Sequence, residues 1–395
     1  MKSFAQTFAV VLAIVVLGAW LMPCAYGQTS SQFLVGWYSQ ISHPEWLAGH
    51  AAAGSNVIVP YNGAWSPSSI KPYLDEAQLR GIKVMVDLRV DSLALPEAQY
   101  RQIIRDNKNH PALYGWYISD EPELWGTSPS LVNQYYTWTK SEDPGHPALI
   151  AHCQVASPDY LNGYDQLMLD YYPGWTLYDG NLFNWMVRGS YNRWQDGIAF
   201  AKQYNRPFFA VGLGFGANQD GTPNNGTRDL NYDEYRFHVF SAIVQGVTGF
   251  LFWEDDWANT RVKPIIEQMI GQIKAIGAQM RIGVGVTGDS QITVSQPSTK
   301  IVYRHGVNGS EHVILAVNIS GYATTNSGET LSNIRVTLPA AASPARVDVL
   351  NENRSITLSG NYFTDNFRPF EVHVYRYALG TAPAGPSNLR ITTAP

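Results

Sequence analysis

The chain has 395 residues, of which 45% are hydrophobic and 15% charged, so it can bury a large core and is long enough for one large and one smaller domain. Its net charge of -5 leaves no excess of basic residues, which argues against nucleic acid as a partner. Its 12 Trp and 23 Tyr provide many aromatic faces of the kind on which sugar rings stack, although such residues also fill protein cores.

Residues 1–27 have the pattern of a cleaved secretory signal peptide. Lys2 supplies a positive charge, Phe8–Leu21 is an apolar run, and Ala25–Gly27 offers small residues at the two positions that define a cleavage site. The run is too short for a convincing membrane span. We therefore expect a secreted or periplasmic protein with no membrane association after cleavage.

Cysteine and histidine usage argues against a metal or cofactor. Cys153 is the one cysteine that remains after signal cleavage, so neither an intrachain disulfide nor a cysteine metal cluster is expected. The nine His have no metal-binding spacing such as HExxH. We expect no metal site and no cofactor.

Between residues 28 and 283, short apolar runs alternate with segments of helical periodicity. Continuous apolar runs are typical of parallel strands that are covered on both faces. Eight strand–helix units over roughly 250 residues predict an α/β fold of the (β/α)8 TIM-barrel class. A doubly wound open sheet is the alternative, but no glycine-rich dinucleotide loop follows the first strand. The expected strands are Phe33–Tyr38, Asn56–Tyr61, Ile82–Leu88, Leu113–Ile118, Ala148–His152, Gln166–Tyr171, Phe208–Phe215 and Thr248–Trp253.

The composition changes after about residue 284. Thr, Ser, Val and Asn dominate from there, and alternating runs are separated by turn residues at fairly regular spacing. This pattern predicts a small all-β sandwich domain over residues 284–377. Residues 378–395 are interpreted as a linker and the start of a truncated further module.

The most informative stretch of the barrel region is Leu113–Trp125, LYGWYISDEPELW. Its first half is an apolar, aromatic strand, and Pro122 ends it because proline cannot donate to a sheet ladder. Asp120, Glu121 and Glu123 follow at this end, where acids are costly unless they are used or well paired. In isolation, the tetrapeptide Asp120–Glu123 (DEPE) is more often a charged loop before a helix.

The rest of the chain favours a functional site. In such barrels the active site lies at the mouth formed by the carboxyl ends of the strands. Acids end the third, fourth, sixth and eighth expected strands, so they should converge on one bowl rimmed with aromatic residues. The candidate catalytic residues are Glu121, Asp170 and Glu254, and the candidate substrate-binding residues are Trp37, Tyr38, Tyr61, Asp87, Asp120, Tyr171, Tyr172 and Trp253.

Two carboxyl groups across an aromatic cleft are the arrangement that glycosidic cleavage requires. One must be held protonated to donate to the leaving oxygen, and burial against Trp and Tyr raises a carboxyl pKa in that direction. The other must stay ionised, to attack the anomeric carbon or to activate water. A carboxyl separation near 5 Å would indicate retention of configuration, and about 6.5–9.5 Å inversion.

Three segments resemble barrel glycoside hydrolases of clan A. Trp116–Pro122 (WYISDEP) resembles their strand-four signature, in which an Asn-Glu-Pro triplet carries the acid/base glutamate. Asn231–Trp253 is similar to their last helix and strand, and Phe370–Tyr377 resembles the closing strand of their usual β-sandwich companion. The resemblance implies that Glu121 is the acid/base residue and that Asp120 takes the place of the Asn.

Two departures from this pattern bear on the mechanism. Asp120 in its ionised form cannot donate a hydrogen bond as an amide would. The seventh expected strand carries no Glu, although the clan's nucleophile is expected there. Asp170 and Glu254 are equal contenders for the second carboxylate. Arg236, on the last barrel helix before strand eight, is expected to be a structural ion-pair partner.

The sequence therefore predicts a secreted glycoside hydrolase that acts on a poly- or oligosaccharide. The alternative is a barrel that binds carbohydrate without cleaving it, because the strand-seven acid is missing. A polysaccharide lyase or esterase is a weaker possibility, since there is no GxSxG elbow and no calcium loop. The expected partner is a carbohydrate, and the sequence gives no indication of the oligomeric state.

Overall fold

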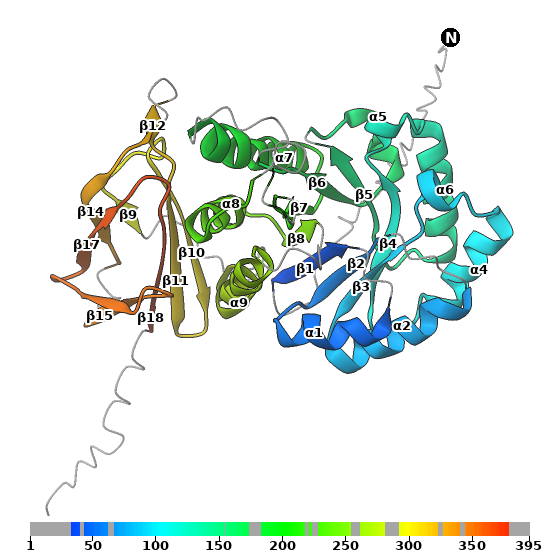
Figure 1. Cartoon of the computed structure of the whole chain (residues 1–395), viewed down its shortest axis with the longest axis horizontal. Coiled ribbons are helices and arrows are strands. Elements are labelled where there is room, and N and C mark those ends of the chain that lie inside the picture. The colour runs from blue at the N-terminus through cyan, green and yellow to red at the C-terminus, as the bar shows by residue number, and fades with distance from the viewer. Residues whose placement is uncertain are drawn as a thin grey trace, which may run out of the picture.

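The structure is a computed structural model of the chain, shown in Figure 1. The predicted signal peptide, the predicted C-terminal module and Glu254 lie outside the residues that it describes. The described residues are 33–39, 43–61, 67–153, 155–173, 183–217, 220, 222, 228–253, 261–280, 292–322, 327–339 and 344–378.

Eight parallel strands close into a barrel in chain order, with β1 paired to β8, which confirms the predicted TIM barrel (Figure 1). All eight expected strands are present, with ends that differ from the expected ones by at most two residues. The strands are β1 (Leu34–Ser39), β2 (Val57–Pro60), β3 (Lys83–Asp87), β4 (Leu113–Asp120), β5 (Ala148–Cys153), β6 (Gln166–Asp170), β7 (Phe208–Leu213) and β8 (Gly249–Trp253).

Side chains alternate between the two faces of each strand. One set packs inside the barrel, and the other packs against the surrounding helices. The strands are apolar on both faces because neither face meets water, as the continuous runs in the sequence indicate. The interior set is Leu34, Tyr38, Val57, Val59, Met85, Tyr117, Leu149, Ala151, Met168, Phe209, Val211 and Leu251.

Helices surround the barrel between successive strands (Figure 1). The longer ones match the helical periodicity of the sequence, whereas the short α3 and α5 lie in loops at the carboxyl ends of strands. The helices are η1 (Pro44–Trp46), α1 (Leu47–Ala52), α2 (Pro67–Arg80), α3 (Val90–Leu93), α4 (Glu97–Asn107), α5 (Pro122–Trp125), α6 (Pro129–Glu142), η2 (Pro158–Gly163), η3 (Asn184–Tyr191), α7 (Asn192–Gln203), α8 (Tyr232–Gln245) and α9 (Lys263–Met280).

The C-terminal region is an all-β domain, as predicted. A five-stranded sheet in the order β10-β11-β18-β15-β16 and a three-stranded sheet in the order β17-β14-β9 enclose a separate apolar core. The strands are β9 (Thr293–Val294), β10 (Ile301–Asn308), β11 (Glu311–Asn318), β12 (Gly321–Tyr322), β13 (Ser327–Gly328), β14 (Leu331–Thr337), β15 (Arg346–Val349), β16 (Arg354–Thr357), β17 (Tyr362–Phe367) and β18 (Val372–Ala378).

The helix α8 lies between the barrel and the all-β domain (Figure 1). Its residues from Glu234 to Val244 are all buried, because one side packs on β7 and β8 and the other on β10, β11 and β18. A capping box between Asn231 and Glu234 starts the helix, and Gly246, with φ of 102°, ends it. A helix with no solvent-exposed face over these residues is expected only where both of its sides are covered.

Candidate active site

The carboxyl end of β4 is reshaped by a β-bulge. Tyr117 pairs with Leu149 of β5, but Ser119 pairs with the next residue, Ile150, so the register shifts by one. Strict alternation after Tyr117 would point Ser119 into the barrel, whereas the bulge turns Asp120 inward instead. The Tyr117 hydroxyl donates to the Asp120 carboxylate at 2.6 Å, which shows that both side chains share the interior.

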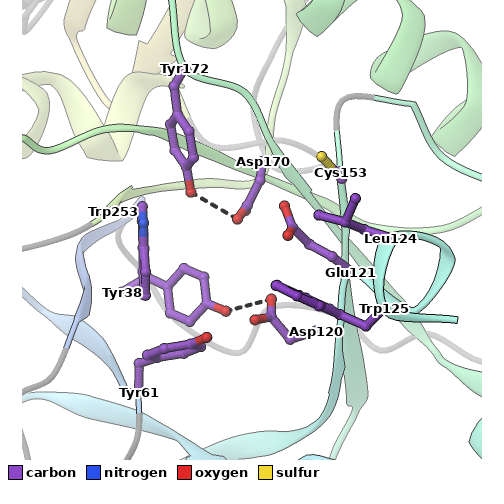
Figure 2. A pocket seen from close by; sticks show the side chains of 10 residues that line it. All are labelled: Tyr38, Tyr61, Asp120, Glu121, Leu124, Trp125, Cys153, Asp170, Tyr172 and Trp253. Carbon is purple, nitrogen blue, oxygen red and sulfur yellow. Dashed lines mark hydrogen bonds between the residues drawn. The ribbon is translucent and has the colours of Figure 1, made fainter. Parts of the chain in front are cut away.

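Glu121 follows in the left-handed region of backbone conformation. Its φ is 42° and its ψ is 51°, a conformation that costs a non-glycine residue about 1–3 kcal/mol. Its backbone N–H donates to the Ala151 carbonyl at 2.8 Å, and Pro122 begins the helix α5. The chain therefore leaves the sheet at this point, and the Glu121 side chain points into the mouth of the barrel (Figure 2).

A second acid ties α5 to the neighbouring strand. The Glu123 carboxylate accepts from the backbone N–H of Cys153 and lies 2.9 Å from Nδ1 of His152. His152 is fully buried. The tether fixes α5 against the end of β5, and so it helps hold Glu121 in its strained conformation.

The mouth of the barrel contains a cavity of about 280 Å³ into which three carboxyl groups project (Figure 2). They come from the ends of β4 and β6, and aromatic side chains from β1, β2, β6 and β8 face them. The lining residues are Tyr38, Tyr61, Asp120, Glu121, Leu124, Trp125, Cys153, Asp170, Tyr172 and Trp253.

Asp120 is held by a buried network beneath the cavity. The Tyr38 hydroxyl donates to its carboxylate at 2.8 Å, and Nη1 of Arg89 donates at 3.2 Å. The same guanidinium binds both oxygens of Asp87, at 2.8 and 3.1 Å, and stacks on the Tyr61 ring at 3.8 Å. Because three hydroxyl or guanidinium donors surround it, the Asp120 carboxylate is a fixed negative charge beside Glu121.

Glu121 and Asp170 form an interacting carboxyl pair. Burial and the charge of Asp120 raise the pKa of Glu121 from 4.5 to about 7. Burial and the charge of Glu121 raise the pKa of Asp170 well above its usual value. Since the charge of Glu121 opposes ionisation of Asp170, the two carboxyl groups titrate as a pair in which the ionised form of one favours the protonated form of the other.

The two members of the pair differ in their contacts. The Tyr172 hydroxyl donates to Oδ2 of Asp170 at 2.9 Å, and burial and the carboxylate raise the pKa of that hydroxyl, so it remains a donor. Oδ1 of Asp170 has no hydrogen-bond partner among the described residues. Glu121 is less buried and shares a hydrogen bond with the Cys153 thiol, which opposes the rise of its pKa. The free acceptor of Asp170 is therefore available to a ligand.

Aromatic rings make up one wall of the cavity, and the rim is apolar. The Trp253 ring lies 4.7 Å from Tyr38 and 4.4 Å from Tyr61, measured between centroids. On the rim, Leu124 and Trp125 of α5 are 57% and 66% exposed. Large exposed apolar side chains beside a cavity mark a surface that meets a ligand.

The structure brings most of the predicted site residues together but not all. Trp37 and Tyr171 face the helical layer, where Trp37 packs on Phe252 and Tyr171 on Trp194. Asp87 lies behind the cavity, bound to Arg89. Tyr38, Tyr61, Asp120, Glu121, Asp170, Tyr172 and Trp253 line the cavity.

Leu124, Cys153 and the role of Arg89 were not predicted from the sequence. Strand parity would have found Cys153, which is two residues after the inward-facing Ala151. Parity would also have separated Asp170 from Tyr171, since neighbouring residues of one strand face opposite sides. Among the described residues, no group of His, Cys, Asp and Glu has the arrangement of a metal site. None of the described helices is both long and apolar enough to cross a membrane.

Comparison with known proteins identifies the fold. No family model and no curated protein matches the sequence. Among solved structures, an α-amylase from Geobacillus thermoleovorans in complex with acarbose has a TM-score of 0.54 at 11% identity, covering 88% of this chain and 98% of that one. A GH27 β-L-arabinopyranosidase from Geobacillus stearothermophilus has a TM-score of 0.54 at 12% identity, covering 91% and 98%.

A GH30 endoxylanase from Clostridium papyrosolvens also shares the fold, with a TM-score of 0.52 at 12% identity, covering 88% of this chain and 97% of that one. All three alignments span nearly the whole of the solved chain. The barrel and the all-β domain together are thus the fold of these glycoside hydrolases, as the strand-four resemblance implied. The identities are low enough that chemistry has to be argued from this chain's own side chains.

Proposed function

We propose that the protein is a secreted glycoside hydrolase that cleaves O-glycosidic bonds of a poly- or oligosaccharide with Glu121 and Asp170. The observation that carries this proposal is the interacting carboxyl pair in an aromatic cavity at the carboxyl ends of β4 and β6. The shared fold supports it, because active sites of such barrels lie at this mouth. Secretion rests on the signal-peptide pattern of residues 1–27.

In this mechanism Glu121 donates its proton to the leaving glycosidic oxygen. Its carboxyl group is the more exposed of the pair and lies beside the rim of α5, where a leaving group can depart. The raised pKa keeps it protonated below about 7, as general acid catalysis requires. After departure of the leaving group, Glu121 is left as a carboxylate.

Asp170 acts as the second carboxylate. Its Oδ1 either attacks the anomeric carbon or takes a proton from the water that attacks it. The hydrogen bond from Tyr172 stabilises the ionised form that both routes need. NMR of the first product distinguishes the routes, because attack by Asp170 gives retention and attack by water gives inversion.

Replacement of each carboxyl group tests the proposal. Glu121→Gln and Asp170→Asn keep the shape of each side chain but remove the proton donor or the carboxylate, so each should lower kcat about 10²- to 10⁴-fold. Oligosaccharide binding, measured by calorimetry, should persist in Glu121→Gln. Asp196→Asn, on the outer helix α7, removes an exposed acid and should leave the rate unchanged.

The competing function is a barrel that binds carbohydrate without cleaving it. It is favoured by the end of β7, Gly214-Phe215-Gly216, where no acid is present. Wild-type protein that binds oligosaccharides but releases no reducing ends from any of them would establish this alternative. Full activity of both carboxyl variants would instead place the catalytic acids elsewhere.

A further inference from the structure

Among the described residues, the charged side chains that line the cavity are all acidic. Asp120, Glu121 and Asp170 line it, and none of the lining residues among the described part of the chain is Lys, Arg or His. Oδ1 of Asp170 is buried, has no protein partner in that part, and can only accept a hydrogen bond while ionised. The protein therefore presents acceptors to a ligand at this depth, and a ligand must bring the donors.

The guanidinium of Arg89, beneath the cavity, is paired with acids of the protein itself. The Arg89 side chain is 2% exposed, and its guanidinium binds Asp87 and Asp120 while the Tyr61 ring covers it. It offsets the charge of Asp120 from below. It has no exposed face with which to bind a ligand carboxylate, so the cavity lacks the Arg fork that recognises such groups.

Among the described residues that follow β7 and β8, the arginines are also paired with acids. Arg228 binds both oxygens of Glu234, at 2.6 and 2.8 Å, and Arg261 binds Asp229 at 2.6 Å. In the sequence, the segments that follow the second, sixth and eighth strands contain four acidic residues and no Lys, Arg or His. These segments are 62–66, 174–182 and 254–260.

A sugar carboxylate in this cavity would face uncompensated negative charge. Two like charges about 5 Å apart in a partly buried site repel strongly enough to weaken binding roughly 100-fold or more. An uncharged sugar avoids this repulsion, because its hydroxyls donate to the carboxylates and its C–H faces pack on Tyr61, Trp253 and Trp125.

We infer that the cavity takes an uncharged sugar unit and discriminates against uronic acids and sulfated sugars by at least about 100-fold. This inference rests on the proposed function, because it names the substrate class of the same site. The discrimination arises from three acids and aromatic walls with no cation among the described lining residues, and so it concerns charge rather than the identity of the sugar.

The test compares polysaccharides that differ only in charge. Each uronic acid polymer, such as polygalacturonate, is paired with the same polymer after chemical reduction of its carboxylates to alcohols, and neutral glucans, xylans, mannans and galactans complete the panel. Reducing-end release and binding by affinity electrophoresis are measured for each polymer. Cleavage and binding of neutral members at least about 100-fold better than charged ones support the inference.

The possible failures are distinguishable. Cleavage of a uronic acid polymer as fast as its reduced form, or faster, overturns the inference and leaves the hydrolase proposal intact. If nothing is cleaved, the hydrolase proposal fails, and binding alone decides the inference: preference for the reduced polymer supports it. Equal binding of both forms, or binding of neither, overturns it.

A charge-introducing variant provides an independent check. Leu124→Arg places a cation on the exposed rim, and Leu124→Gln controls for the loss of the apolar side chain. The affinity ratio between reduced and charged polymers should fall at least about threefold in Leu124→Arg relative to Leu124→Gln at low salt and recover at high salt. An unchanged ratio would contradict a charge-based origin.

Discussion

At the scale of single residues, the site consists of groups held in states that they would avoid in water. Glu121 has a left-handed backbone and a pKa near 7, and Asp170 is a buried carboxyl with an unused acceptor. Such states persist only where the surroundings over-determine them, and they cluster at functional sites. Arg89 beneath Asp120 and Tyr172 beside Asp170 are the surroundings that hold the charges here.

The residue-scale prediction concerns pH and Cys153. Glu121 must be protonated to act as an acid, so kcat/KM should fall as pH rises through about 7. The Cys153 thiol hydrogen bond lowers the pKa of Glu121, against the larger effects of burial and Asp120. Cys153→Ala removes this bond and should shift the pH at which kcat/KM falls upward by a few tenths of a unit.

The matched control is Cys153→Ser, which keeps a hydrogen-bond donor of similar size. Its kcat/KM should fall at a pH closer to that of the wild type. Because Cys153 is a positioning residue, kcat at low pH should change little in either variant. A pH profile that is identical in all three proteins would contradict the assignment of Glu121 as the titrating acid or of the thiol as its partner.

At the scale of elements, the sequence analysis predicted the eight strands because their apolar runs are continuous and both faces are buried. It did not predict the bulge in β4, because bulges arise from pairing with β5 and leave no mark in the run LYGWYISD itself. The bulge decides that Asp120 rather than Ser119 faces the cavity. The acids at the strand ends predicted a cluster of carboxyl groups at the mouth of the barrel. The pairing between neighbouring strands determines which of these side chains face the cavity.

The element-scale prediction concerns the tether of α5. Glu123→Ala leaves the N–H of Cys153 and the buried His152 without their partner, so the four-residue helix loses its anchor on β5. Glu121 should then sample other backbone conformations, and kcat should fall about 10- to 100-fold. Steady-state kinetics and thermal unfolding measure the two consequences.

Glu123→Gln serves as the control, because its side-chain oxygen still accepts from the Cys153 N–H. It should recover much of the lost kcat. The loss of activity in Glu123→Ala should appear in kcat more than in KM. It should also be larger than the loss that a small drop in Tm would cause. A defect of equal size in both variants would instead indicate a role for the Glu123 charge.

At the scale of the whole molecule, the two domains share a buried interface centred on α8. Arg236 of α8 lies within hydrogen-bond distance of the Glu352 carboxylate at 3.3 Å and donates to the carbonyls of Val372 at 2.8 Å and Leu350 at 3.3 Å. The expected structural ion-pair role of Arg236 is confirmed. The sequence predicted both domains but not this interface. The sequence of a buried helix indicates that the helix is covered, but it does not identify the elements that cover it.

Among the described residues, the interface contains one buried and one exposed ion pair. Arg236 and Glu352 have side chains only 6% and 18% exposed, whereas Asp233 and Arg368 are 60% and 68% exposed and 3.4 Å apart. Buried, hydrogen-bonded charges are costly to leave unpaired, but exposed pairs contribute little. The same interface therefore provides both a test and its control.

Arg236→Met should reduce the free energy of unfolding by about 3 kcal/mol, because it leaves the buried Val372 carbonyl, the half-buried Leu350 carbonyl and part of the Glu352 charge without a donor. Asp233→Asn, which removes the exposed pair, should change it by less than about 1 kcal/mol. Urea unfolding monitored by tryptophan fluorescence measures both values, because Trp37, Trp116 and Trp194 are buried in the barrel region and become exposed on unfolding. Equal effects of the two substitutions would show that the apolar packing of α8, and not its buried arginine, joins the domains.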